Sequence, residues 1–156
     1  MSSDERARAL SRELVEVHNR LRDELRRVTD ELDNYTGSRP VDLRAHCLAF
    51  CTALTRHHTS EDDIAFPALA QRFPELAPVL QGLSDDHRLV ADILQRLREL
   101  LADVGTGNLP RIKGEIAGLT AILESHFRWE ERRIVTAFDQ LPIGEHSNSE
   151  LFGVSA

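Results

Sequence analysis

Two histidine–glutamate pairs with the same spacing are the residues of this chain best suited to chemistry. His57 precedes Glu61 by four positions, and His126 precedes Glu130 by four. Positions four apart on a helix lie one above the other, so each pair would project two ligands from one face. An ionised carboxylate inside a protein needs a partner or a bound cation. If these faces are buried, the pairs predict a metal site, whereas an exposed pair would be a local ion pair.

Two further histidines interrupt apolar helical stripes. His18 lies four residues after Leu14 and three before Leu21, and His87 lies four residues after Leu83. A lone histidine in such a stripe is more often a hydrogen-bonded core residue than a ligand. Their significance therefore depends on whether they lie near the two pairs.

The spacing of the four histidines indicates that they lie at one level. They follow one another at intervals of 39, 30 and 39 residues, and each interval has turn residues near its midpoint: Gly37, Pro74, and Gly105 with Gly107. Residues equally far from a hairpin turn on its two arms lie side by side. The predicted metal ligands are His18, His57, Glu61, His87, His126 and Glu130.

The types of ligand favour a pair of iron ions. Imidazole and carboxylate without thiolate suit iron, manganese or zinc, and bridging carboxylates favour two ions over one. Iron is the preferred assignment, and manganese and zinc stay open. Ferritin-like diiron bundles use a Glu-x-x-His motif, which does not occur in this sequence.

The elements that position these residues are four amphipathic helices. Apolar residues recur at steps of three and four, the helical period, through four segments: 4–34, 41–66, a third that ends near 104, and 108–140. Pro67 is expected to disturb or end the second segment, and a short helical turn is expected at 75–81. The sequence predicts an all-α, antiparallel up-down-up-down four-helix bundle over residues 1–140, followed by a polar tail at 141–156.

Composition narrows the class of protein. A chain of 156 residues with a net charge of -7 and no basic stripe disfavours nucleic-acid binding. No apolar run approaches the roughly 20 residues of a membrane span, and Met1 to Glu5 do not resemble a secretory signal, so we expect no membrane association and a cytoplasmic location. Cys47 and Cys51 are then expected to be reduced and buried.

The pattern resembles the hemerythrin and HHE cation-binding family over roughly residues 10–140. The matching features are His18, the run from His57 to Leu69, His87, and the run from His126 to Glu131. The resemblance implies a hemerythrin-like bundle with an oxo- or hydroxo-bridged diiron site. It also implies that Glu61 and Glu130 bridge the ions and that the histidines are terminal ligands.

One departure from the family affects the expected number of ligands. Oxygen-carrying members have a second histidine four residues from the first in the third helix, where this chain has Leu83 and Ala91 around His87. Four histidines instead of five leave two coordination positions open instead of one. His58 is a candidate replacement, but it lies about 100° around the helix from His57, which favours a solvated or outer position.

The remaining polar and aromatic residues near the motifs receive supporting roles. We expect Asp62, Asp63 and Glu131 to be surface or outer acids, and His46 and His146 to be structural or exposed. The residues expected to wall the site, or simply to pack in the core, are Phe50, Phe66, Phe127, Trp129 and Ile134.

These observations favour a non-haem diiron protein that binds oxygen, peroxide or nitric oxide, with turnover left open. One alternative is a sensor that reports the iron or oxygen state to a protein partner, and another is an iron buffer without turnover. No hydrolytic triad, phosphate loop or dinucleotide fingerprint supports another class of enzyme.

Overall fold

The computed structural model describes residues 3–104 and 107–138, with the side chains of 11–104, 107–135 and 137. Every regular element within these ranges is helical, as predicted. The elements in chain order are α1 (Ser3–Asp33), α2 (Pro40–Ser60), a π-helix η1 (Glu61–Ala65), α3 (Phe66–Arg72), a 3-10 turn η2 (Pro74–Leu76), α4 (Ala77–Leu101) and α5 (Leu109–Phe138).

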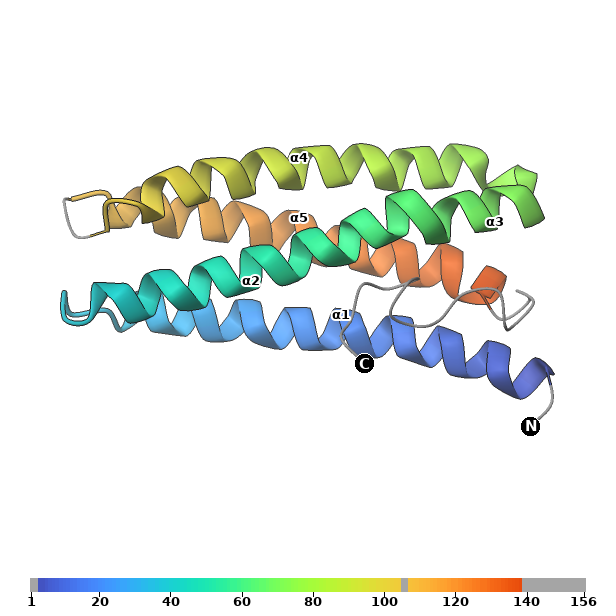
Figure 1. The fold of residues 1–156 in the computed structure, drawn as a ribbon, viewed down its shortest axis with the longest axis horizontal. Coiled ribbons are helices and arrows are strands. Elements are labelled where there is room, and N and C mark those ends of the chain that lie inside the picture. The colour runs from blue at the N-terminus through green and yellow to red at the C-terminus, as the bar shows by residue number, and fades with distance from the viewer. Residues whose placement is uncertain (1–2, 105–106, 139–156) are drawn as a thin grey trace.

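The long helices form an antiparallel bundle (Figure 1). The α1–α2 and α4–α5 connections lie at one end, and α3 leads into α4 at the other, so the helix direction alternates along the chain. Helix α1 packs against α2 and α5, and α4 packs against α5 and α2. The predicted up-down-up-down topology is confirmed, and each helix directs one face toward a shared interior.

The connections use residues suited to sharp turns and helix starts. Gly37 and Gly107 both have φ near +90°, which glycine adopts without steric cost. Pro40 is the first residue of α2, where its missing N–H costs no helical hydrogen bond. Asn108, just before α5, donates from its side-chain amide to a carbonyl near the end of α4 at 2.8 Å, which ties the two helices together.

The predicted apolar stripes form the core. Buried members are Leu14, Leu21, Leu25, Val28 and Leu32 in α1; Leu43, Cys47, Phe50 and Leu54 in α2; Leu83, Val90, Leu94, Leu97 and Leu101 in α4; and Ile112, Ile116, Leu119, Leu123, Ile134 and Ala137 in α5. Both cysteines are buried and free, as expected. This burial supplies the main driving force for assembly of the bundle.

The second helical segment is disturbed just before Pro67, as one of the two expected outcomes, but it does not end there. The helix passes through the five-residue π-helix and continues to Arg72. The backbone N–H of Phe66 donates to the carbonyl of Glu61, five residues back, and Pro67 follows where no N–H is available. Buried Phe66 and Leu69 hold the continuation against the bundle, so tertiary packing overrides the proline signal.

The other boundaries lie close to the prediction. Helix α4 begins at Ala77, inside the range expected for a short turn, and α5 begins one residue after its predicted start. The last predicted residue of α5, Gln140, and the tail at 141–156 lie outside the described residues. Within the described helices, none has both the length and the apolar composition that a bilayer crossing needs.

Candidate metal centre

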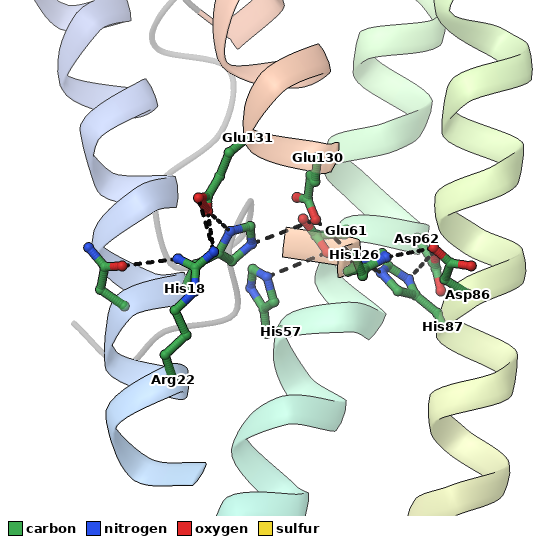
Figure 2. A network of polar contacts seen from close by, with 11 residues as sticks. His18, Arg22, His57, Glu61, Asp62, Asp86, His87, His126, Glu130 and Glu131 are labelled. Atoms are coloured by element: carbon green, nitrogen blue, oxygen red, sulfur yellow. Dashed lines mark hydrogen bonds and ion pairs between the residues drawn. The ribbon is translucent and has the colours of Figure 1, made fainter. Parts of the chain in front are cut away.

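The bundle brings the six predicted ligands together at one level of its interior (Figure 2). Each is at most 5% exposed. They come from all four long helices and the π-helix: His18 from α1, His57 from α2, Glu61 from η1, His87 from α4, and His126 with Glu130 from α5. The fold therefore places the six residues on inward helix faces and at one depth, as their spacing predicted.

The side chains form two overlapping groups, each suited to one ion. Within each group the ligand atoms lie within 4.8 Å of one another. One group is His58, Glu61, His87 and His126, and the other is His18, His57, Glu61 and Glu130. Glu61 belongs to both groups, so its carboxylate lies where it could bridge two ions.

The distances around Glu61 support this shared position. Its Oε1 atom is 3.3 Å from Nε2 of His87 and 3.5 Å from Nε2 of His57, one histidine from each group. Glu61 is the first residue of the π-helix, and its own backbone N–H donates to carbonyls of α2. Single-turn π segments are frequent at functional sites.

Glu130 lies next to Glu61 and also contacts one histidine from each group. Its Oε2 atom is 3.3 Å from Nε2 of His126 and 3.6 Å from Nε2 of His18. These two histidines again belong to different groups. Both carboxylates therefore approach both halves of the site.

Burial of the two carboxylates is energetically unfavourable without a cation. Both are 0% exposed, and none of their four oxygens accepts a hydrogen bond from the described part of the chain. Burial, together with the nearby charge of Glu130, raises the pKa of Glu61 well above its usual range. Burial also opposes ionisation of Glu130, but His18, Glu61 and His126 outweigh it and hold the pKa of Glu130 well below the usual range.

Outer carboxylates fix the orientation of three histidines. In each, Nδ1 donates to a carboxylate oxygen: His18 to Glu131 (3.1 Å), His87 to Asp62 (2.9 Å) and His126 to Asp86 (3.0 Å). An ionised carboxylate only accepts hydrogen bonds, so Nδ1 carries the proton. In a neutral imidazole the lone pair is then on Nε2, which faces the centre, as in metal-binding histidines.

These outer acids are themselves held in place. Asp62 accepts a hydrogen bond from Ser84 at 2.7 Å, and Glu131 accepts one from Arg22 at 3.1 Å. Asp62 and Glu131 thus take the outer positions expected of them, while Asp63 is exposed. Sequence reasoning missed Asp86, because nothing in the sequence distinguishes it from the adjacent Asp85.

Of the two positions expected for His58, the solvated one was wrong. His58 is 5% exposed, and its ring stacks on His87 with centroids 3.8 Å apart and planes 11° from parallel. Burial first, then the neighbouring His87, lowers the pKa of His58 well below its ordinary value and keeps the imidazole neutral. The angle between His57 and His58 around α2 allows these adjacent residues to serve different donor groups.

The arrangement fits a metal ion. Nε2 of His87 and Nε2 of His126 are 3.1 Å apart, and both rings already donate from Nδ1, so two lone pairs converge unless a proton or cation lies between them. His58 adds a further Nε2 without a hydrogen bond. Imidazoles and carboxylates without thiolate suit iron, manganese or zinc.

Aromatic rings enclose the donor groups. Phe127 stacks on His18 with ring centroids 4.1 Å apart, and Phe66 lies nearly parallel to His87 at 5.7 Å. Both are almost fully buried, so they limit water at the histidines they cover. The other three residues expected to wall the site belong to the helix packing: Phe50, Trp129 and Ile134.

Of the histidines given no functional role, His46 is exposed and contacts Glu31 at 2.7 Å, in agreement with the expectation. His146 lies outside the described residues.

Comparison with known families agrees with the geometry. The model of the hemerythrin HHE cation-binding domain matches residues 9–144, which is most of the chain. Comparisons with curated proteins and with solved structures gave no match. The chain belongs to the hemerythrin HHE cation-binding domain family, and its buried histidines and glutamates form a candidate metal site.

Proposed function

We propose that this chain is a non-haem diiron protein that binds dioxygen, peroxide or nitric oxide in the bundle core. The observation that carries the proposal is the pair of donor groups that share Glu61 and leave its oxygens without hydrogen bonds. One iron would be held by His58, Glu61, His87 and His126, and the other by His18, His57, Glu61 and Glu130.

His58 changes the expected coordination. With His58 included, five histidines and two carboxylates face the centre, in place of the four histidines expected from the sequence. If both carboxylates contacted both ions and one oxygen were shared between them, five histidines would leave one position open for a small ligand. Such an arrangement would support ligand binding at a single position. His58 would supply the fifth histidine, which α4 lacks because Leu83 and Ala91 stand on either side of His87.

The chain's own residues prepare the site. Bound iron would supply open coordination and electrons for exchange with a small molecule. Asp62, Asp86 and Glu131 hold the Nδ1 protons on the outer side of three histidines, so that the Nε2 lone pairs face inward. Phe66 and Phe127 limit access of water.

The decisive test is the metal content of the full chain grown with iron, followed by absorption spectra of the reduced protein with oxygen, peroxide or nitric oxide. Two irons per chain and a ligand-dependent spectrum are expected. Glu61→Ala and Glu130→Ala should each abolish two-metal binding. Full occupancy in both variants, or no bound metal in the folded wild type, would overturn the proposal. A stable spectral change without turnover would favour a binding or sensing protein over an enzyme.

A further inference from the structure

A cleft of about 400 Å³ lies between α2 and α4, directly beside the candidate centre. Its outer walls carry hydroxyl and amide groups, and Ala91 leaves space on the α4 side. The polar wall residues are Thr55, Thr59, Gln81 and Ser84. The cleft also includes Asp62, which accepts hydrogen bonds from Ser84 and His87.

Two candidate ligands close the inner wall of the cleft. His58 and His87 both line it, and both belong to the donor group that includes Glu61 and His126. Their rings stack 3.8 Å apart. A molecule in the cleft would therefore lie beside two candidate ligands.

His58 differs from the neighbouring histidine in its hydrogen bonding at Nε2. Nδ1 of His87 donates to Asp62, which Ser84 also holds. Nε2 of His58, in contrast, has no hydrogen bond in the part of the chain that the structure describes. Of the two rings in the inner wall, His58 is the one whose displacement breaks no hydrogen bond at Nε2.

The chemistry of the cleft indicates the class of molecule that it accepts. Hydroxyl and amide groups offer both donors and acceptors, which an apolar diatomic molecule would not use. The cleft also holds charges of both signs, Asp62 and Arg88, so it does not favour a strong anion or cation. Val90, Ala91 and Leu94 complete the lining with apolar surface, so the cleft suits a small, neutral molecule that also forms hydrogen bonds.

We propose that the α2–α4 cleft is the entrance through which a neutral hydrogen-bonding oxidant of the hydrogen peroxide class reaches the centre past His58. The proposal deepens the proposed function, since it rests on metal binding at the adjacent site. It adds a route and a preference among the candidate small molecules.

A smaller pocket supplies a matched control. It has a volume of about 220 Å³, lies between α1 and α5, and is lined by Thr120 and Phe127 among others. Phe127 stacks on His18, so this pocket approaches the opposite donor group. Filling it should leave entry through the α2–α4 cleft unaffected.

The first arm of the test fills each space and measures rates on the iron-loaded full chain. Ala91→Phe and, from the opposite wall, Thr59→Phe should slow the reaction with hydrogen peroxide about tenfold or more, while nitric oxide association changes less than about twofold. Ala91 and Thr59 are exposed, so neither change disturbs the core. Ala91→Ser and Thr120→Phe should behave as wild type, with equal metal content in all variants.

The second arm needs no metal. Diethyl pyrocarbonate, a small neutral reagent, is applied to the metal-free full chain, and modification of each histidine is followed by peptide mass spectrometry. Ala91→Phe should slow modification of His58 about tenfold while exposed His46 reacts at the wild-type rate. This arm keeps its meaning if the chain binds no iron, in which case the proposed function fails separately. Wild-type rates for peroxide and for His58 in the filled variants, or slowing by Thr120→Phe, would overturn the proposal.

Discussion

At the scale of single residues, the centre concentrates groups that are costly to bury. Glu61 and Glu130 are fully buried without hydrogen bonds to their oxygens, and several kcal/mol is the typical penalty for a buried ion that is not compensated. Such residues reduce the stability of the metal-free protein, and bound cations would offset that cost.

The first prediction concerns Glu61→Leu in metal-free protein. Removing this carboxylate should raise the free energy of unfolding at pH 8 by about 1–3 kcal/mol. The unfolded state loses the Glu61 proton above the ordinary glutamate pKa of about 4.3. The folded state keeps this proton to higher pH, because the pKa of Glu61 is raised there. The stability linked to this proton is present below that pH and is lost as pH rises, so the advantage of the leucine variant should grow between pH 5 and pH 8.

Urea unfolding in the presence of chelator at both pH values measures this difference. Glu99→Leu, at an exposed glutamate of α4, is the control and should show no pH-dependent advantage. If the excess free energy of unfolding of Glu61→Leu over wild type becomes smaller toward pH 8, the raised pKa of Glu61 is contradicted.

The second prediction concerns the outer carboxylates. Asp62→Ala, Asp86→Ala and Glu131→Ala should each weaken metal affinity about 10- to 100-fold without changing the number of ions bound at saturation. The reason is that each removes the acceptor that fixes one imidazole with Nε2 inward.

Competition with a chelator of known affinity measures this effect. Asp63→Ala changes an exposed acid next to Asp62 and should leave the affinity at the wild-type value. Equal affinities for Asp62→Ala and Asp63→Ala would show that the hydrogen bond to His87 has no role in binding.

The sequence predicted the residues that follow helical periodicity, but it left His58 only as a candidate replacement and gave Asp86 no role. His57 with Glu61, and His126 with Glu130, were found because a spacing of four places both members on one face. The positions of His58 and Asp86 depend on how α2 and α5 are rotated against α4, and one amphipathic stripe does not specify that rotation.

At the scale of elements, the π-helix explains how a helix with Pro67 continues along the bundle. Its wider turn contains one residue more than an α-turn, so the helices on either side keep the register of their buried faces. The sequence predicted that Pro67 disturbs or ends this helix near Phe66, because proline normally interrupts α-helical hydrogen bonding. The contribution of Phe66 and Leu69 to the core was not apparent from that local signal.

The third prediction uses this register. Deleting exposed Asp63 from the π-helix should convert the turn to α-helix and keep the thermal midpoint within a few degrees of wild type, since the flanking faces stay aligned. Deleting exposed Thr52 from the regular part of α2 should lower the midpoint by about 10 °C or more, because the preceding and following faces rotate by about 100° relative to each other. Circular dichroism melts measure both. Equal losses in the two deletions would mean that the π-helix does not absorb the extra residue.

At the scale of the whole molecule, the centre lies inside a bundle whose core continues beyond it in both directions. Buried Leu32 and Leu101 lie in the last turns of α1 and α4, which lead into the α1–α2 and α4–α5 connections, and buried Leu69 lies in α3. The amphipathic pattern predicted this topology well, because short turns and four apolar stripes permit few other packings. We therefore expect the fold to persist without metal, at lower stability.

The fourth prediction tests this separation of fold and metal binding. Chelator treatment of the metal-loaded wild type should lower the thermal midpoint by about 5 °C or more, because ligands that bind only the folded state stabilise it. The far-ultraviolet circular dichroism signal at 25 °C should change little. Glu61→Ala, which lacks the shared ligand, should have the same midpoint with and without chelator. A wild type that loses its helical signal on chelation would show that the bundle depends on the metal to fold.

The stack of His58 on His87 has a consequence for how such centres change over time. An imidazole from α2 occupies space beside His87, next to the cleft lined by Ala91, one turn further along α4. A donor lost from one helix is thus replaceable from the facing helix, with the number of nitrogens preserved while their positions in the sequence move. Metal ligands in such bundles are therefore best compared by their positions in space and not by their positions in the sequence. Two chains with different histidine patterns could hold the same set of donor atoms.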